Sequence, residues 1–421
     1  MSFIVSTLGP PSALHTRSSA TSNSSSGSPA LNLIAAFASA GLELYNPTSL
    51  RIDRYGTAVV GRGQYSVVDI GQTYYGQQVA VKRSRLLRHP LPEDEEHAFE
   101  DSLNQISLEL CILSHELLKN HANIVKLLGA CIDNNSQLPS LGVVVEFSSF
   151  GTLRSFLQAH ESTILWDSCF DLAHQVISGL DELHQLRICH GDVKMENTLV
   201  FNESGKWIVK LSDFGQSVVA AQDDPNALSG FPYGTPLYNA REVRNHTVFE
   251  ANSFGMNDAL ATDIFSFGLL AWEILKKGEC FFERSWITSD GALPHLENML
   301  SHIEVLAPGV LLELCLAFVA RLGLQSDKHK RICAVFAACL PDLPDKRKTS
   351  STVKAILNDD RVPEYVSINP LCDKPDWRSC PMDGHRNPAL DDIPSPVVMW
   401  TFRQSLQDVK ISLAHLILYR S

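Results

Sequence analysis

The stretch that decides the fold is CHGDVKMENTLVF, Cys189–Phe201, in which polar side chains stand directly before an apolar run. Asp192, Lys194 and Asn197 lie in one short patch, and the run that follows them predicts a buried strand. A surface loop has no need of these three side chains together. A site that handles phosphate and magnesium does, because magnesium prefers oxygen ligands and an ammonium group neutralises phosphate. The rest of the sequence decides between the two interpretations.

The composition limits the class of protein. The chain has 421 residues, enough for a two-lobed domain with extensions, and its net charge of −12 argues against nucleic acid or an anionic membrane as a partner. Most of the ten cysteines lie in apolar runs, which is typical of reduced, buried thiols and predicts a cytoplasmic or nuclear protein. The start of the chain and the apolar segment Ala30–Ala40 resemble neither a secretory signal nor a membrane span, so we expect no membrane partner.

Three regions follow one another along the chain. Residues 1–49 are rich in serine and are predicted to form a disordered tail that includes a short docking helix. Residues 50–359 are the predicted folded domain. Residues 360–421 are rich in proline and end in an amphipathic pattern. We expect that last helix to pack on the domain, and the alternative is that residues 397–419 bind a partner through it.

The folded domain changes character along its length. Residues 50–147 show alternating patterns and turns that predict strands, together with one helix that has an acidic first turn. Residues 148–359 show longer apolar patterns that predict helices. Strands followed by helices indicate the α+β class, here as two unequal lobes.

Residues that could bind a nucleotide occur in the first lobe. Gly61 and Gly63 form a predicted turn whose backbone N–H groups could approach phosphate, and Ser66 stands where a third glycine might be expected. Lys82 ends an apolar strand and needs a counter-charge, because an unpaired buried cation is costly. Phosphate oxygens can supply it, and so can Glu109, which lies within the apolar stripe of the predicted helix. We therefore expect a Lys82–Glu109 ion pair.

A second acidic group follows another apolar strand. Asp213 comes directly after the run WIVKLS and, together with Asn197, provides oxygen ligands for magnesium. Asp192 is then free to orient an attacking hydroxyl group or to accept its proton. Lys194 would neutralise the transferring phosphoryl group. The polar patch is thus interpreted as a phosphoryl-transfer loop.

At this point the chain resembles the eukaryotic protein kinases over roughly residues 53–358. The family's motifs occur in order as Gly61-x-Gly63 with Val68, Lys82, Glu109, Asp192 to Asn197, and Asp213-Phe214-Gly215. The resemblance implies a bilobal kinase-like fold, with a small antiparallel sheet plus one helix in residues 50–147 and a large helical lobe in residues 148–359. It also implies ATP and Mg²⁺ as cofactors and protein substrates. Lys194 together with Thr235 suits serine/threonine kinases better than tyrosine kinases.

The resemblance assigns further roles by position. Glu146 and Ser148 would lie in the hinge whose backbone binds adenine, and Val145 would be the small gatekeeper in front of it. The side chains that would enclose the adenine ring are Val68, Ala80 and Leu199. The regulatory spine would be formed by Leu113, Leu127, Phe214 and His190. Asp263 would anchor the catalytic loop from a buried helix. The run GTPLYNARE, Gly234–Glu242, would end the activation segment, and Glu242 would pair with Arg347.

Three residues depart from the family pattern. Gly191 replaces the usual arginine, so the resemblance implies a kinase of the non-RD type and predicts activity that does not need phosphorylation of the activation loop, for example at Ser229. Arg241 replaces the usual proline before Glu242 and is expected to loosen that turn without removing the pair to Arg347. Ser66 is expected to weaken nucleotide affinity slightly.

Two alternatives stand beside a protein kinase. The sequence HGD also occurs in small-molecule phosphotransferases of the same broad fold, although the glycine turn and the predicted activation segment suit a protein substrate better. A pseudokinase scaffold is the second alternative. Such scaffolds usually lack residues of the type of Lys82, Asp192 or Asp213, and this chain has all three.

Overall fold

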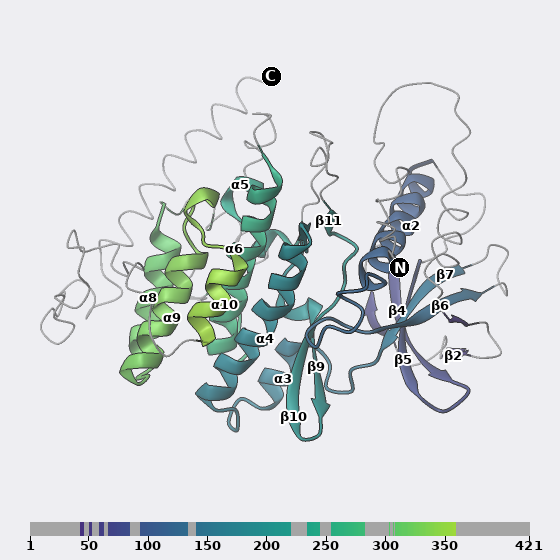
Figure 1. Ribbon diagram of the computed structural model, residues 1–421, viewed down its shortest axis with the longest axis horizontal. Coiled ribbons are helices and arrows are strands. Elements are labelled where there is room, and N and C mark those ends of the chain that lie inside the picture. The colour runs from purple at the N-terminus through teal and green to yellow at the C-terminus, as the bar shows by residue number, and fades with distance from the viewer. Residues whose placement is uncertain are drawn as a thin grey trace, which may run out of the picture.

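The computed structural model shows two lobes side by side, a sheet with one helix and a larger helical body (Figure 1). It describes residues 43–45, 50–52, 59–62, 66–84, 93–133, 140–219, 234–244, 254–282, 303, 306 and 308–358. Most of the predicted N-terminal tail and all of the predicted C-terminal extension, including residues 397–419, lie outside the described residues. The α+β fold with two unequal lobes is confirmed.

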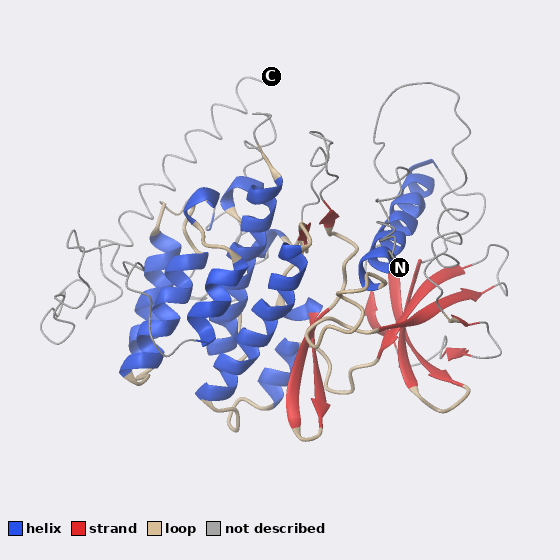
Figure 2. Cartoon of the chain, viewed as in Figure 1, coloured by secondary structure: helices blue, strands red, loops and turns tan. Residues whose placement is uncertain are grey.

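The smaller lobe is a seven-stranded sheet covered by one helix (Figure 2). Its strands are β1 Leu44–Tyr45, β2 Leu50–Ile52, β3 Val59–Arg62, β4 Ser66–Thr73, β5 Gln78–Ser84, β6 Leu127–Asp133 and β7 Ser140–Glu146. The order is β1-β6-β7-β5-β4-β2, and β3 also pairs with β4. Helix α2, Glu93–Leu113, packs against β5 and β7. Every pairing is antiparallel except the one between β1 and β6.

Strand β1 lies within residues 1–49, which the sequence analysis assigned to a tail. The amide of Ala130 donates to the carbonyl of Glu43 at 2.9 Å, and the Tyr45 side chain is buried against the sheet. This close approach depends on Gly129, because a Cβ at that position would lie 2.3 Å from the Glu43 carbonyl oxygen. The sheet therefore begins before residue 50 and gains one parallel pair.

The larger lobe is built mainly from helices. They are α3 Leu153–Ala159, α4 Trp166–Gln185, α5 Arg241–Arg244, α6 Met256–Leu275, α8 Val310–Arg321, α9 Ser326–Cys339 and α10 Ser350–Asn358, with the short 3-10 turns η1 Met195–Asn197, η2 Pro236–Tyr238 and η5 Pro344–Lys346. Every residue of α6 from Thr262 to Leu275 is buried. Because α6 is enclosed on all sides, it lies inside the domain, and α4 and α9 pack against it.

Short strands place the polar patch between the lobes. The strand β8 Ile188–Cys189 pairs with β11 Val218–Val219, and β9 Thr198–Glu203 forms a hairpin with β10 Lys206–Leu211. Leu211 donates its amide to the carbonyl of Asn123 at 2.9 Å and accepts from the amide of Val125 at 2.9 Å. The loop between β8 and β9 is thereby held beside the segment that leads into the sheet.

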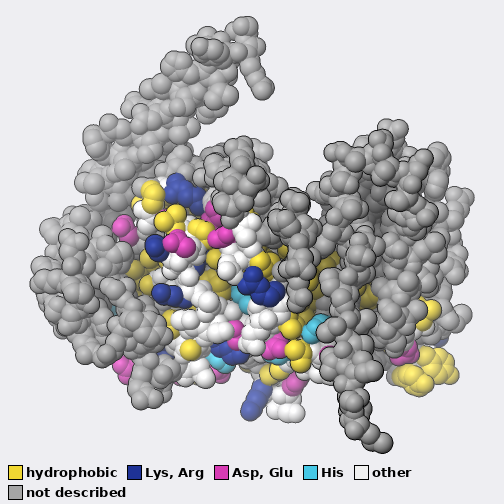
Figure 3. All heavy atoms as spheres, turned by 45° about the horizontal axis from the view of Figure 1, so that its top comes forward, with side chains coloured by type: hydrophobic (Ala, Val, Ile, Leu, Met, Phe, Trp, Pro, Cys, Tyr) yellow, Lys and Arg dark blue, Asp and Glu magenta, His cyan; other side chains and the backbone are white. Residues whose placement is uncertain are grey.

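The surface of the helical lobe is mixed in character. On the face that Figure 3 shows, basic, acidic and apolar side chains of the described residues lie interspersed. Among the helices that the structure describes, none combines the length and the apolar character needed to cross a membrane.

Candidate active site

Lys82 lies between the two lobes and contacts acidic residues of both. It stands on β5, and its Nζ atom lies 2.6 Å from Oε2 of Glu109 on α2 and 2.6 Å from Oδ1 of Asp213. The predicted Lys82–Glu109 pair is confirmed. Because Asp213 follows β10 in the other lobe, the same ammonium group also joins the two lobes.

The charges of this cluster depend on one another. Burial alone would lower the pKa of Lys82, but Asp213 and Glu109 outweigh it and raise that pKa above its ordinary value. Burial raises the pKa of Glu109, and Lys82 opposes this rise. Asp213 is more exposed, and Lys82 holds its pKa below the ordinary value of 3.8 against the effect of burial. Lys82 and Asp213 therefore both carry their charge at neutral pH.

In the tripeptide Asp213-Phe214-Gly215, the phenylalanine packs in the hydrophobic core. The Phe214 side chain is fully buried, and its ring centroid lies 5.1 Å from that of His190. Leu113 belongs to the same hydrophobic core as Phe214, and the partly buried Leu127 packs against that core. Stacking of all four residues as a spine stays a prediction. Asp213 itself has a φ of +64°, a left-handed conformation that Asp tolerates better than most residues and that persists where the surroundings fix it.

The carboxylate of Asp192 accepts four hydrogen bonds. Its Oδ2 atom accepts from Nζ of Lys194 at 2.7 Å and from Nδ2 of Asn197 at 2.7 Å. Its Oδ1 atom accepts from the amide and the hydroxyl of Thr235, each at 2.8 Å. Lys194 also donates to the Thr235 hydroxyl at 2.6 Å. The carboxylate is thus held in one orientation by the catalytic loop and by the end of the activation segment together.

Asp263 on α6 holds the backbone in front of Asp192. Its Oδ2 atom accepts from the amide of His190 at 2.7 Å, and its Oδ1 atom accepts from the amide of Gly191 at 2.9 Å. Burial would raise the pKa of Asp263, but the hydrogen bond to His184 and the charges around it bring that pKa below its ordinary value. The predicted anchoring by Asp263 is confirmed.

Gly191 is required by the backbone at this point. Its φ is +78°, and a Cβ here would lie 2.3 Å from the carbonyl oxygen of Gln216. A Cβ at Gly234 would in turn lie 2.3 Å from the carbonyl oxygen of Gly191. Glycine at position 191, in place of the family's usual arginine, therefore allows a close approach. Gln216 and Gly234, which lie toward the two ends of the activation segment, both pack against the catalytic loop at this residue.

The end of the activation segment is tied to the helical core. Arg347 is buried and donates to both carboxylate oxygens of Glu242, at 2.5 and 2.9 Å, which confirms the predicted pair. The expectation that Arg241 loosens this turn stays a prediction. Arg241 donates to the carbonyl of Leu306 at 3.0 Å and lies 3.7 Å from Oδ1 of Asp342. Its length lets it reach contacts that a proline could not make.

The side chains of the predicted hinge residues Glu146 and Ser148 form hydrogen bonds with other parts of the protein. Glu146 accepts from the amide of Lys126 at 2.7 Å and from Nζ of Lys210 at 3.0 Å. Ser148 donates to the carbonyl of Val200 at 2.5 Å and to that of Gly151 at 3.2 Å. These contacts fix the hinge and leave its backbone as the part that could bind adenine. Sequence reasoning missed Lys210, although a lysine inside an apolar strand is the same signal that identified Lys82.

The predicted adenine contacts come from both lobes. In the sheet, Val68 stands opposite Lys82 and Ala80 stands opposite Val145, while Leu199 lies on β9 in the other lobe. Of the predicted phosphate-binding turn, Gly61 pairs with Val68 on the neighbouring strand and Ser66 begins β4. Gly63 lies outside the described residues.

The oxygen donors fit magnesium. Asn197 uses its amide nitrogen to bind Asp192, so the oxygen of the same amide can serve as a ligand. Asp213 has a side chain that is 46% exposed, with one oxygen on Lys82 and the other available. Magnesium is usually bound through one or two carboxylates plus the phosphates of the substrate, and these two residues provide such a partial set.

Comparison with known proteins places the chain in a family. The family described as protein tyrosine and serine/threonine kinase matches residues 56–298, which is more than half of the chain. The chain belongs to this kinase family. The matched residues include Asp192 and the ion-paired cluster of Lys82, Glu109 and Asp213.

The curated proteins to which this chain is similar are named as protein kinases. The probable serine/threonine-protein kinase drkC of Dictyostelium discoideum is 30% identical over 220 residues, 52% of this chain and 26% of that protein. The serine/threonine-protein kinase STY17 of Arabidopsis thaliana is 29% identical over 216 residues, 51% of this chain and 32% of that protein. The dual specificity protein kinase shkB of Dictyostelium discoideum is 29% identical over 225 residues, 53% of this chain and 30% of that protein. The chain thus spans about a quarter to a third of the length of these relatives.

Proposed function

We propose that this kinase transfers the γ-phosphoryl group of ATP, in the presence of magnesium, to serine and threonine hydroxyls of protein substrates. The observation that carries the proposal is the geometry around Asp192. Both oxygens of that carboxylate are held, by Lys194 and Asn197 on one side and by Thr235 on the other. A base fixed in this way stands ready to orient a hydroxyl group.

Nucleotide binding would use the groups that lie between the two lobes. Lys82, held by Glu109, would contact phosphate oxygens, since its ammonium group is a strong donor that stays charged. The backbone from Glu146 to Ser148 would bind the adenine edge, between the apolar side chains of the two lobes. Asn197 and Asp213 would hold magnesium, which supplies positive charge to the β- and γ-phosphate oxygens.

Phosphoryl transfer would then proceed at Asp192. The substrate hydroxyl oxygen forms a bond to the γ-phosphorus as the bond from that phosphorus to the bridging oxygen of ADP breaks. Asp192 accepts the proton that the hydroxyl group loses, and such a positioned base contributes about 10²–10⁴-fold to the rate. Lys194, whose Nζ lies 2.7 Å from Asp192, would stabilise the charge on the transferring group.

Serine and threonine are the proposed acceptors because Lys194 bridges Asp192 and Thr235, an arrangement that suits these hydroxyls. Two of the relatives named above are serine/threonine kinases, whereas shkB is named a dual specificity kinase. Matched peptides that carry serine, threonine or tyrosine as their single acceptor separate these outcomes. We expect phosphate on serine and threonine, and transfer to tyrosine alone would refute the assignment.

The two alternative functions are less well supported. Lys82, Glu109, Asp192 and Asp213 are all present and in contact with partners, which favours an enzyme over a pseudokinase scaffold. The end of the activation segment contacts the catalytic loop through Thr235, which favours a protein substrate over a small amino alcohol. Phosphorylation of choline or an aminoglycoside, but of no peptide, would instead support the small-molecule phosphotransferase.

The proposed location of the kinase is the cytoplasm or nucleus. The cysteines that the structure describes are free thiols, and Cys169, Cys189, Cys315 and Cys339 among them are fully buried. Reduced thiols of this kind are usual in a reducing compartment. Immunofluorescence with a compartment marker would test the proposal.

A further inference from the structure

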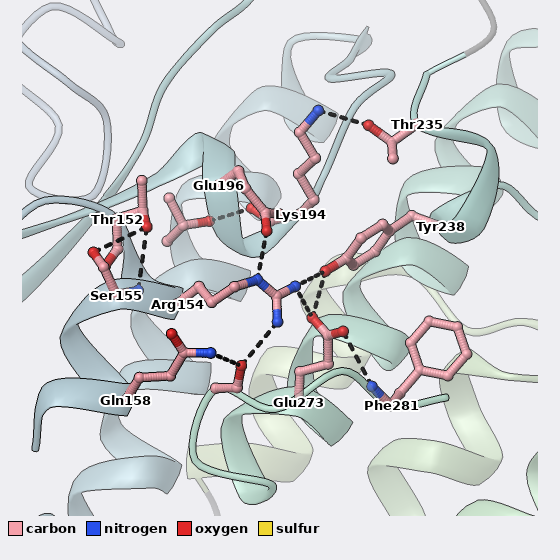
Figure 4. Close-up of polar contacts among 12 residues, drawn as sticks. Thr152, Arg154, Ser155, Gln158, Lys194, Glu196, Thr235, Tyr238, Glu273 and Phe281 are labelled. Atoms are coloured by element: carbon pink, nitrogen blue, oxygen red, sulfur yellow. Dashed lines mark hydrogen bonds and ion pairs between the residues drawn. The ribbon is translucent and has the colours of Figure 1, made fainter. Parts of the chain in front are cut away.

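Arg154, the second residue of α3, contacts four other parts of the helical lobe (Figure 4). Its Nε atom donates to Oε1 of Glu196 at 2.5 Å, and its Nη1 atom donates to the carbonyl of Gly278 at 2.8 Å. Its Nη2 atom donates to the hydroxyl of Tyr238 at 2.8 Å and to Oε2 of Glu273 at 2.9 Å. These partners come from the catalytic loop, the turn after α6, the activation segment and α6 itself, so one side chain joins α3 to all four.

The Arg154 contact with Glu273 is a buried ion pair. Glu273 is fully buried, its Oε2 atom also accepts from the Tyr238 hydroxyl, and its Oε1 atom accepts from the amide of Phe281 at 3.1 Å. Burial raises the pKa of Glu273, and the charge of Arg154 opposes that rise. Within the described part of the chain, Arg154 is the cation that lies within ion-pair distance of this carboxylate. Removing Arg154 alone would therefore leave a buried carboxyl group without its counter-charge.

Two of the other three Arg154 contacts, those with Glu196 and Tyr238, lead toward Asp192 without touching it. Glu196 lies in η1, the turn of the catalytic loop whose neighbouring residues donate to Asp192. Tyr238 ends η2, three residues after Thr235, which donates twice to Asp192 from the activation segment. Arg154 thus holds both of the segments between which the carboxylate is fixed.

We propose that Arg154 is a positioning residue that sets the catalytic loop against the end of the activation segment, and so controls phosphoryl transfer to the protein substrate without affecting nucleotide binding. The inference rests on the proposed function. In this proposal the guanidinium group of Arg154 has two effects. One is the charge balance of Glu273, and the other is the placement of Glu196 and Tyr238 relative to Asp192.

Two variants distinguish these effects. In Arg154→Met, the carboxyl group of Glu273 is left uncompensated, so both thermal stability and transfer are expected to fall. In the double variant Arg154→Met with Glu273→Gln, the buried charge is gone. The glutamine oxygen can still accept from the amide of Phe281, and its amide nitrogen can donate to the Tyr238 hydroxyl, which no longer accepts from Arg154. Stability should return toward that of the wild type, whereas the contact from Arg154 to Glu196 stays lost.

The experiment uses the full-length chain and measures the melting temperature, KM for ATP and kcat for a serine peptide in parallel. In the double variant we expect a melting temperature near that of the wild type, a KM for ATP within about twofold, and a kcat lower by about tenfold or more, since small misplacements of reacting groups are costly. Arg187→Gln is the matched control, because Arg187 is an arginine of the same lobe whose Nη1 donates to Asn257 at 2.6 Å outside the site.

Each outcome has one meaning. A double variant that recovers both its stability and its kcat would show that Arg154 has only a structural role and would overturn the inference. A KM for ATP that rises as far as kcat falls would do the same, because nucleotide binding would then depend on Arg154. If the wild-type protein itself transfers no phosphate, the proposed function fails, and the inference fails with it for that separate reason.

Discussion

Replacing Gly191 by alanine tests how closely the catalytic loop and the activation segment have to pack. The φ of +78° at Gly191 costs an L-residue about 1–2 kcal/mol. The added Cβ would also lie 2.3 Å from the carbonyl oxygen of Gln216, whereas real Cβ contacts essentially never fall below 3.0 Å. The two segments would have to separate by about 0.7 Å, the difference between these two distances.

The surroundings of Gly191 would carry this shift into the site. The amide of Gly191 is held by Asp263 at 2.9 Å, and its carbonyl oxygen packs on Gly234. The movement therefore falls on the 2.8 Å contacts between Thr235 and Asp192. A displacement near 1 Å can cost about 10²-fold in rate, so we expect kcat to fall by about 10- to 100-fold. The free energy of unfolding should fall by about 1–3 kcal/mol.

The assay compares kcat for a serine peptide and denaturant unfolding between the wild type, Gly191→Ala and a matched control. Gly205→Ala is that control, because Gly205 has a φ of +85° but nothing within 4 Å of an added Cβ. We expect the control to lose about 1–2 kcal/mol of stability from its φ alone and to keep its kcat. A Gly191→Ala variant with the kcat of the wild type would refute the reasoning about close packing.

Three further predictions follow from the same contacts. Glu109→Gln keeps the hydrogen bond to Lys82 but not the charge, so KM for ATP should rise and kcat should fall, with kcat/KM lower by about 10-fold or more. Steady-state kinetics that leave kcat/KM unchanged would contradict the role of this pair. Ser229→Ala should leave kcat unchanged, since glycine at position 191 provides no cation for a phosphorylated activation loop. A rate gain that depends on phosphate at Ser229 would show that activity does require phosphorylation of this loop. Asp263 has a pKa below its ordinary value of 3.8, so its charge stabilises the fold at neutral pH and this contribution is lost as the pH falls through the lowered value. The stability gap between the wild type and Asp263→Asn should therefore be full at pH 7 and shrink below about pH 3.8 in urea unfolding; a gap that widens toward acid would show the opposite sign.

The residues of the site that could be predicted from the sequence are charged residues in apolar surroundings, because such a residue requires a partner. Lys82 at the end of an apolar strand needs a counter-charge, and Glu109 inside an apolar stripe needs a reason to be there. The buried Asp263 and the Glu242–Arg347 pair came from the family pattern, and the geometry bears them out.

The parts that could not be predicted depend on distances between remote segments. Strand β1 pairs in parallel only because Gly129 leaves space for it, and nothing in a two-residue strand marks this in the sequence. Arg241 gained contacts at Leu306 and Asp342, whose position beside it is set by the packing of other helices. The Arg154 cluster likewise joins segments that are 42 to 124 residues apart.

The central claim is that Lys82, Asn197, Asp213 and Asp192 act together on one nucleotide bound with magnesium. The most direct test follows transfer of the γ-phosphoryl group from labelled ATP to a serine peptide, with and without magnesium, in the wild type and in Asp192→Asn. We expect transfer that requires magnesium and that falls by about 10²-fold or more in the variant, while ATP still protects both proteins against thermal unfolding. Equal turnover of the two proteins, or a wild type that neither binds nor uses ATP with magnesium, would contradict the account.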